Sequence, residues 1–156
     1  MDKNEDVNAD VKLALEEMRL NMQDSISAGN AIDQKLILVL TVAGIILAIT
    51  EPLQGVFSRP HPMWYSLLVA TALVLYILAI GIALFGARPQ RYQGAIASKW
   101  DELTEHIFGK TERDAILSLL SGYVDQIQHN LKINRRKGIA FQISFIVLLV
   151  TVLLLF

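Results

Sequence analysis

Three stretches of this chain contain no Asp, Glu, Lys or Arg, and they constrain its fold more than any other feature. They are Leu36–Thr50, Met63–Ala87 and Ile139–Phe156. At about 1.5 Å of rise per residue, the second and third can cross a hydrocarbon core of about 30 Å, and the first can if it extends to Leu53. Unpaired backbone groups are costly in hydrocarbon, so all three are expected to be helices. Buried helices of a soluble protein are a poor alternative, because such helices normally keep a polar face.

Basic residues are distributed unevenly around these stretches. Four precede the first stretch and nine lie between the second and the third, whereas the connection between the first and the second carries only Arg59. Loops rich in Lys and Arg remain in the cytoplasm. The sequence therefore predicts an all-α membrane protein with three transmembrane helices, with its N-terminus inside and its C-terminus outside.

The composition narrows the possible functions. The chain is 53% hydrophobic, has a formal net charge of -1 and contains no cysteine, which excludes disulfides, thiol catalysis and cysteine-ligated metals. Its polar, acidic first ten residues do not fit a cleaved signal peptide. The three histidines (His61, His106 and His129) form no metal-binding motif, and no glycine-rich phosphate loop is present. We therefore predict no catalytic residue, no metal and no resident cofactor, and we do not expect an enzyme.

The polar segments have the periodicity of amphipathic helices. Residues 1–30 are predicted to form a cytoplasmic amphipathic helix that ends or bends at Gly29-Asn30. Residues 31–88 then form a two-helix transmembrane hairpin, residues 89–137 a cytoplasmic helical sensor segment, and residues 138–156 the third transmembrane helix. The apolar positions of the first helix are Val11, Leu15, Met18, Met22 and Ile26.

The sensor segment is predicted to contain two helices. The first covers about Tyr92–Phe108 and ends at Gly109, and the second starts at Thr111, whose hydroxyl can cap it with Asp114 three residues later. No proline follows Thr111, so this second helix can continue into the third span, with Gly122 and Gly138 as weak points. Its apolar stripe consists of Ile116, Leu120, Tyr123, Ile127, Leu131 and Asn134. The two stripes are expected to pack into a cytoplasmic helical bundle, within one chain or between the chains of a homo-oligomer.

Two polar features are candidates for function. A basic and amide-rich cluster precedes the third span and faces Arg88 and Arg91 across the expected cytoplasmic interface. It contains Asn130, Lys132, Asn134, Arg135, Arg136 and Lys137. Such a cluster either anchors the chain to anionic lipid headgroups or binds a phosphate-bearing ligand. Within the third span, Gln142, Ser144 and Thr151 either line a pore in an oligomer or form hydrogen bonds with backbone and neighbouring helices.

Several short motifs resemble a known family. Ala31-Ile32-Asp33-Gln34-Lys35 precedes the first span, which contains Ala43-Gly44, and Ala87-Arg88-Pro89 ends the second. A helix containing Tyr123, Gln126-Ile127, Asn130, Ile133 and Lys137 enters the third. Over about Ala28–Leu149 this pattern resembles the small membrane effectors of Pycsar anti-phage systems and, more loosely, SLATT-type effectors of nucleotide-signalled bacterial defence.

The resemblance implies a nucleotide-regulated effector in the bacterial inner membrane. A partner nucleotidyltransferase or cyclase would make a nucleotide signal during infection, and the effector would oligomerise to form a pore or disrupt the bilayer, which arrests growth. The nucleotide would either open the assembly or hold it closed until infection. If the resemblance holds, five residues are predicted to contact the phosphate groups of the nucleotide. They are Arg88, Arg91, Asn134, Arg135 and Lys137.

Two other functions remain open from the sequence. The chain could be a non-conducting membrane adaptor that recruits a protein through its cytoplasmic bundle. A holin-like lysis protein is the third possibility, which the long amphipathic helices fit poorly because holins are little more than their spans.

Overall fold

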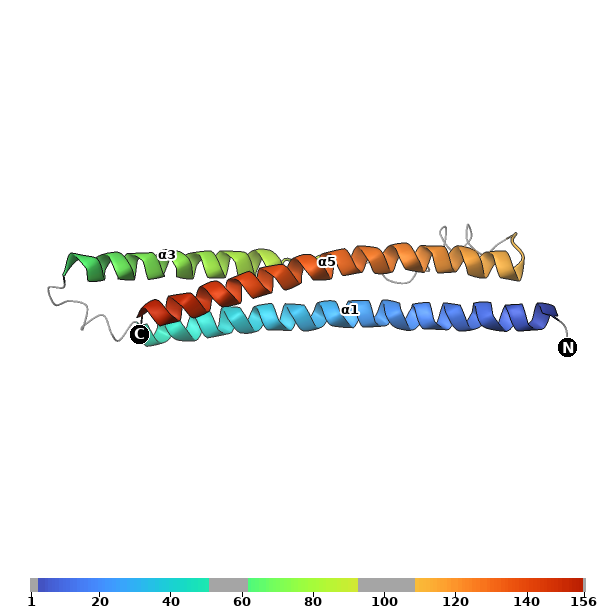
Figure 1. The fold of residues 1–156 in the computed structure, drawn as a ribbon, viewed down its shortest axis with the longest axis horizontal. Coiled ribbons are helices and arrows are strands. Elements are labelled where there is room, and N and C mark those ends of the chain that lie inside the picture. The colour runs from blue at the N-terminus through green and yellow to red at the C-terminus, as the bar shows by residue number, and fades with distance from the viewer. Residues whose placement is uncertain (1–2, 51–61, 93–108, 156) are drawn as a thin grey trace. The chain divides into compact units, whose positions relative to one another are not determined.

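A computed structural model describes residues 3–50, 62–92 and 109–155 (Figure 1). These residues form three helices and no strand: α1 (Lys3–Thr50), α3 (Met63–Gly86) and α5 (Glu112–Leu155). Each of the three is long and apolar enough to cross a membrane. The predicted all-α fold with three spanning helices is therefore confirmed. The orientation with the N-terminus inside stays a prediction.

Neither long helix is interrupted by its glycines. α1 continues through Gly29 and Asn30, where the sequence had suggested an end or a bend, and α5 continues through Gly122 and Gly138. A glycine inside a helix costs about 1 kcal/mol relative to alanine, which tertiary packing readily outweighs. The predicted long helix that enters the third span is confirmed. Leu53, the expected end of the first span, lies outside the described residues.

The start of α5 is capped as predicted. The Asp114 amide N–H donates a hydrogen bond to Thr111 Oγ1 at 3.3 Å, and the Thr111 hydroxyl donates to Asp114 Oδ2 at 2.7 Å. This arrangement satisfies one of the backbone donors that every helix leaves free at its N-terminus. Gly109, just before the cap, has a φ of 78°. The helix predicted over Tyr92–Phe108 lies outside the described residues, apart from Tyr92.

The chain forms two compact units, and each contains a part of α1 and a part of α5. The polar unit comprises Met1–Gly29 and Gln90–Asn134. The membrane unit comprises Asn30–Pro89 and Arg135–Phe156. We use these two names below and describe each unit separately.

Three helices contribute to the core of the membrane unit. Here α3 runs antiparallel to the α1 and α5 segments, as Figure 1 shows. The Tyr76 hydroxyl of α3 donates a 2.8 Å hydrogen bond to the Ala43 carbonyl of α1, so its polar tip is satisfied inside the core. The buried core residues are Leu36, Val39, Ala43, Tyr76, Ala79, Ala83 and Leu148. Several are small, which allows the helices to approach closely, as is common in membranes.

The outward-facing side chains of the membrane unit are largely apolar. Leu38 is 61% exposed, Leu67 is 70% exposed and Leu153 is 71% exposed. A soluble protein rarely exposes so much contiguous apolar surface, whereas lipid tails solvate it readily. The unit thus has a small-residue core and an apolar exterior, as expected of a helical hairpin and a third helix in a bilayer.

Gly86 marks a close approach of α3 to α1 and α5. A Cβ atom at this position would lie 2.7 Å from Ala140 Cβ and 3.3 Å from Leu36 Cδ1, whereas a Cβ at Gly81 would meet nothing within 4 Å. The helices can therefore pack at this point because Gly86 has no side chain.

We expect Gly86→Ala to destabilise the membrane unit by about 1–3 kcal/mol, the usual cost of overpacking. Gly81→Ala, on the same helix, is the matched control and should be neutral or slightly stabilising. Unfolding of the purified chain in mixed micelles measures both free energies. Equal effects of the two substitutions would contradict the packing described here.

Candidate functional site

In the polar unit, α1 and α5 lie side by side and run in the same direction (Figure 1). The two helices meet along a seam of residues that recur at intervals of three and four, the spacing of a coiled coil. On α1 the buried and half-buried members at this spacing are Val11, Leu15, Met18, Met22, Ser25 and Gly29. Two of these six are small or polar, so this seam is less apolar than that of a stable coiled coil.

Asn130 of α5 is the most deeply buried polar residue of this seam. It is 0% exposed, and its Nδ2 donates to Ser25 Oγ at 3.4 Å and lies 3.5 Å from Met22 Sδ. The Ser25 hydroxyl in turn donates to the Met22 carbonyl at 2.7 Å. A buried asparagine in a helix pair fixes the register at a cost in stability, because its amide must find hydrogen-bond partners on the opposite helix.

Asn134, one turn further along α5, connects three parts of the polar unit. Its Nδ2 donates to the Ser25 carbonyl at 2.6 Å, and its Oδ1 accepts a hydrogen bond from the Tyr92 hydroxyl at 3.0 Å. Gly29 makes room for this arrangement, since a Cβ there would collide with the Tyr92 ring and lie 2.7 Å from Asn134 Oδ1. This hydrogen bond joins Tyr92 to the α1–α5 pair.

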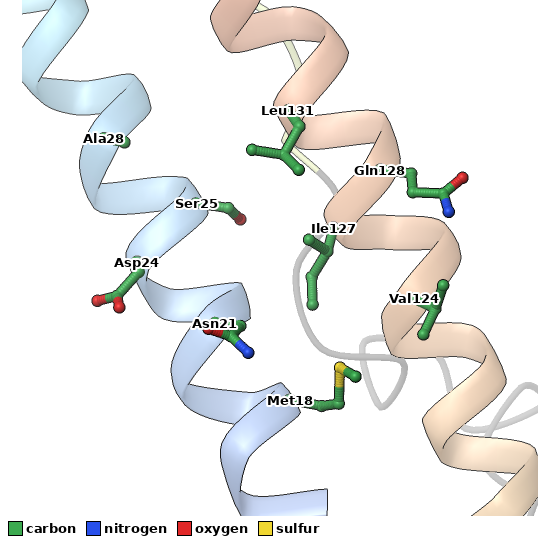
Figure 2. A pocket seen from close by; sticks show the side chains of 9 residues that line it. All are labelled: Met18, Asn21, Asp24, Ser25, Ala28, Val124, Ile127, Gln128 and Leu131. Atoms are coloured by element: carbon green, nitrogen blue, oxygen red, sulfur yellow. The ribbon is translucent and has the colours of Figure 1, made fainter. Parts of the chain in front are cut away.

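A groove of about 540 Å³ opens on one side of the same pair, as Figure 2 shows. The side chains of Met18, Ile127 and Leu131 lie between the two helices, whereas Asp24 and Gln128 point outward. The complete lining is Met18, Asn21, Asp24, Ser25, Ala28, Val124, Ile127, Gln128 and Leu131. No basic side chain is among these residues, so the groove does not have the chemistry of a phosphate site.

The exposed end of the polar unit carries an ion pair. Lys12 Nζ lies 2.8 Å from Glu112 Oε1, and both side chains are more than half exposed. The hydrogen bond and the charge of Lys12 lower the pKa of Glu112 below its ordinary value of 4.5. The stabilisation from this pair is therefore fully present above pH 4.5 and is lost as the pH falls through the lowered pKa. Solvent screening keeps its contribution small.

In the membrane unit, a buried ion pair joins α1 to α5. Lys137 Nζ lies 2.7 Å and 2.8 Å from the two carboxylate oxygens of Asp33. The lysine side chain is 3% exposed and the aspartate side chain 32% exposed. A lysine so deeply buried is costly unless it is paired, so Asp33 makes its position possible.

Residues 15–156 match PycTM, the Pycsar effector protein domain. The chain belongs to the PycTM family. The predicted resemblance is thus confirmed, and the match extends beyond the Ala28–Leu149 range on which the resemblance was based. No curated protein and no solved structure matches the chain.

Family membership makes this PycTM chain a multi-pass membrane effector of Pycsar anti-phage defence. It also implies a cyclic-nucleotide signal from a partner cyclase. The ion pair explains two of the sequence motifs. Asp33 precedes the first span and Lys137 enters the third, and their side chains bind each other.

The five predicted phosphate contacts of this PycTM domain differ in their surroundings. Arg88, Arg91 and Arg135 are exposed, and Arg88 lies over the Phe85 ring at 5.6 Å. Asn134 and Lys137 are buried and already bound to partners within the chain. Arg91 and Asn134 belong to the polar unit and the other three to the membrane unit. Phosphate binding by these residues stays a prediction.

The three predicted pore-lining residues of the third span do not share a face of α5. Ser144 and Thr151 are 0% exposed, and their hydroxyls donate to the Phe141 and Val147 carbonyls at 2.9 Å. Gln142 is exposed on the outside of the unit. Ser144 and Thr151 therefore form the hydrogen bonds with backbone that are the alternative to lining a pore. Pore lining by the three residues stays a prediction.

Sequence reasoning missed several contacts of this site. Asn130 is predicted only as part of the basic cluster at the interface, but it is buried in the α1–α5 seam. Asn134, which belongs both to that cluster and to the predicted stripe of the sensor helix, is buried there as well. Leu131, which was expected on the buried stripe, is 54% exposed and lines the groove. The interval of three between Met22 and Ser25 could have indicated that α1 continues its seam through a serine.

We expect Asp33→Asn to destabilise the membrane unit by about 2–4 kcal/mol, because it leaves the buried Lys137 ammonium without its counter-charge. The double variant Asp33→Lys/Lys137→Asp should recover at least half of that loss, since it restores an ion pair at the same place. Unfolding in mixed micelles measures both values.

Glu112→Gln, which removes the exposed pair with Lys12, is the matched control and should have little effect. If the exchanged pair is no more stable than Asp33→Asn, the ion pair does not hold α1 to α5.

Proposed function

We propose that this chain is a nucleotide-regulated effector of the bacterial inner membrane that oligomerises and forms a pore or disrupts the bilayer, which arrests growth. A partner nucleotidyltransferase or cyclase supplies the nucleotide during infection. The observation that carries the proposal is the polar α1–α5 seam, because both of its helices continue as spanning helices of the membrane unit.

The seam is suited to a two-state response. Asn130, Asn134 and Ser25 occupy positions that leucine or isoleucine would fill in a stable helix pair. Their hydrogen bonds specify the register but add less stability than apolar packing would, so rearrangement of α1 against α5 costs little. A ligand needs only a few kcal/mol of differential affinity to shift such an equilibrium.

The predicted phosphate contacts suggest how the nucleotide acts. Arg88, Arg91 and Arg135 are exposed and present guanidinium groups, which bind phosphate bidentately. Lys137 is available to a phosphate only if it leaves Asp33. In this proposal the nucleotide competes with the Asp33 carboxylate for Lys137, so binding and the separation of α1 from α5 are the same event.

The proposed pore forms between copies of the chain. Gln142 is exposed on α5, where another copy can contact it, whereas Ser144 and Thr151 become available only when the packing that buries them opens. The hydroxyls would then line the open state and be buried in the closed one.

A non-conducting membrane adaptor is the second candidate, and the groove in Figure 2 favours it. The apolar side chains of Met18, Ile127 and Leu131 lie between its two helices, with Asp24 and Gln128 on either side, which is the character of a groove for an amphipathic helix. An adaptor binds a protein there and leaves the bilayer sealed.

We expect liposomes containing the purified chain to release a small fluorescent dye in a nucleotide-dependent manner. The probes are cyclic mononucleotides of each of the four bases, added to chain-containing and empty vesicles. Arg135→Gln should shift the response to higher nucleotide concentration without changing the amount of inserted protein. Vesicles that remain sealed with and without every nucleotide would refute the effector proposal and favour the adaptor.

The absence of cysteine allows a direct test of the α1–α5 rearrangement. The double variant Ser25→Cys/Asn130→Cys places two thiols at positions whose polar atoms are 3.4 Å apart. We expect its disulfide to abolish the nucleotide-dependent change in leakage and reduction to restore it. Each single-cysteine variant is a control that should be insensitive to oxidation. A full response in the oxidised, cross-linked protein would show that the seam does not rearrange.

A further inference from the structure

Gln142 is a polar side chain on the outer surface of an apolar helix. It is the fourth residue of the charge-free run Ile139–Phe156 and is exposed in the membrane unit. Among the described residues, it forms no hydrogen bond. Its neighbour Ile143, at almost the same depth along the helix, is 45% exposed and apolar, as expected for a side chain that contacts lipid.

A carboxamide is costly to expose to lipid tails. It has two N–H donors and one carbonyl acceptor, and hydrocarbon offers a partner to none of them. Polar side chains in spanning helices are therefore found mainly against other helices, where they form hydrogen bonds between helices. This requirement indicates that the Gln142 face of α5 is covered by protein.

The residues around Gln142 form a face that suits another helix. Gly138 lies four residues before Gln142, and Phe145 and Leu149 follow at intervals of three and four, the spacing of helix–helix packing. Phe145 is 50% exposed and Leu149 is 49% exposed, and a Cβ at Gly138 would meet nothing within 4 Å. The face therefore combines an open glycine, a polar residue and two large apolar side chains.

The occupant that best fits this face is the same face of a second copy. A carboxamide is electrostatically complementary to itself, because the partial positive charge of its NH₂ group matches the partial negative charge of another amide's oxygen. Two copies with the same topology place their α5 helices parallel in one membrane, so Gln142 meets Gln142 at equal depth. The open space beside Gly138 lets the two backbones approach closely.

We infer that the Gly138–Gln142–Phe145–Leu149 face of α5 is a homotypic interface in which the Gln142 amides of two copies pair within the membrane. The inference deepens the proposed function by naming the contact between copies, and it rests on that proposal only for the existence of an oligomer. It assigns Gln142 to an interface rather than to the wall of a water-filled pore.

Single cysteines test which face of α5 meets the second copy. In native membranes, oxidation of Gln142→Cys should give a covalent dimer of twice the chain's mass, because disulfide formation requires the two Cβ atoms to come within about 4.5 Å. Ile143→Cys is the matched control, at equal depth but about 100° around the helix, and should give several-fold less dimer. Equal or greater cross-linking at position 143 would overturn the inference, as would a product that contains another protein.

A transposition tests the role of the amide itself. Gln142→Ile/Ile143→Gln keeps the composition and moves the amide off the interface. We expect about 3- to 30-fold weaker self-association, measured by energy transfer between labelled copies in liposomes at defined dilution. Gln142→Asn, which keeps an amide, should retain most of the association. Unchanged association after the transposition would overturn the inference, and the cysteine test remains decisive if the transposed variant does not fold.

Failure of this inference is distinguishable from failure of the proposed function. Nucleotide-dependent leakage without preferential cross-linking at position 142 overturns the interface and leaves the effector proposal intact. A cross-linked dimer in vesicles that remain sealed with every nucleotide supports the interface and refutes the effector proposal.

Discussion

The parallel packing of α1 against α5 is the contact on which both units of this chain depend. Each unit contains a part of both helices, and the buried hydrogen bonds and ion pair between them join residues more than 100 positions apart. In the membrane unit the contact combines small-residue packing with one ion pair, and in the polar unit it relies on amides and a hydroxyl. The third helix, α3, joins this pair through Tyr76 and Gly86.

The two units place different physical demands on that contact. Inside a bilayer, apolar side chains gain little by leaving lipid, so close approach at small residues and satisfied polar groups hold helices together. In the polar unit, water favours apolar burial, yet the seam contains Ser25, Asn130 and Asn134. A protein selected only for stability would not place three polar residues there. The pattern is better suited to a helix pair that must exist in more than one arrangement.

The roles of Asp33 and Lys137 become clear only from their contact with each other. Each is an ordinary charged residue beside a span when considered alone, and the positive-inside pattern explains Lys137 without further assumptions. Their 2.7 Å contact removes the lysine charge from the set that faces lipid headgroups or a ligand. The exposed arginines, including Arg88 and Arg135, thus become the main candidates for binding phosphate groups, with Lys137 as a conditional one.

The sequence by itself determined the three spans, the all-helical class, the cap at Thr111 and the family. These properties are local. In lipid, each helix must satisfy its own backbone hydrogen bonds, and helical periodicity can be recognised from residues that are close together in the sequence. The tertiary structure decided which polar groups meet. Asn134 and Gln142 are both amides on α5, yet one is buried in a hydrogen-bonded seam and the other is exposed to the surroundings. Their surroundings depend on which face of α5 is opposite α1. The amphipathic stripe indicates that face around Asn134, but the charge-free run Ile139–Phe156 is apolar on most sides, so no local pattern specifies it at Gln142.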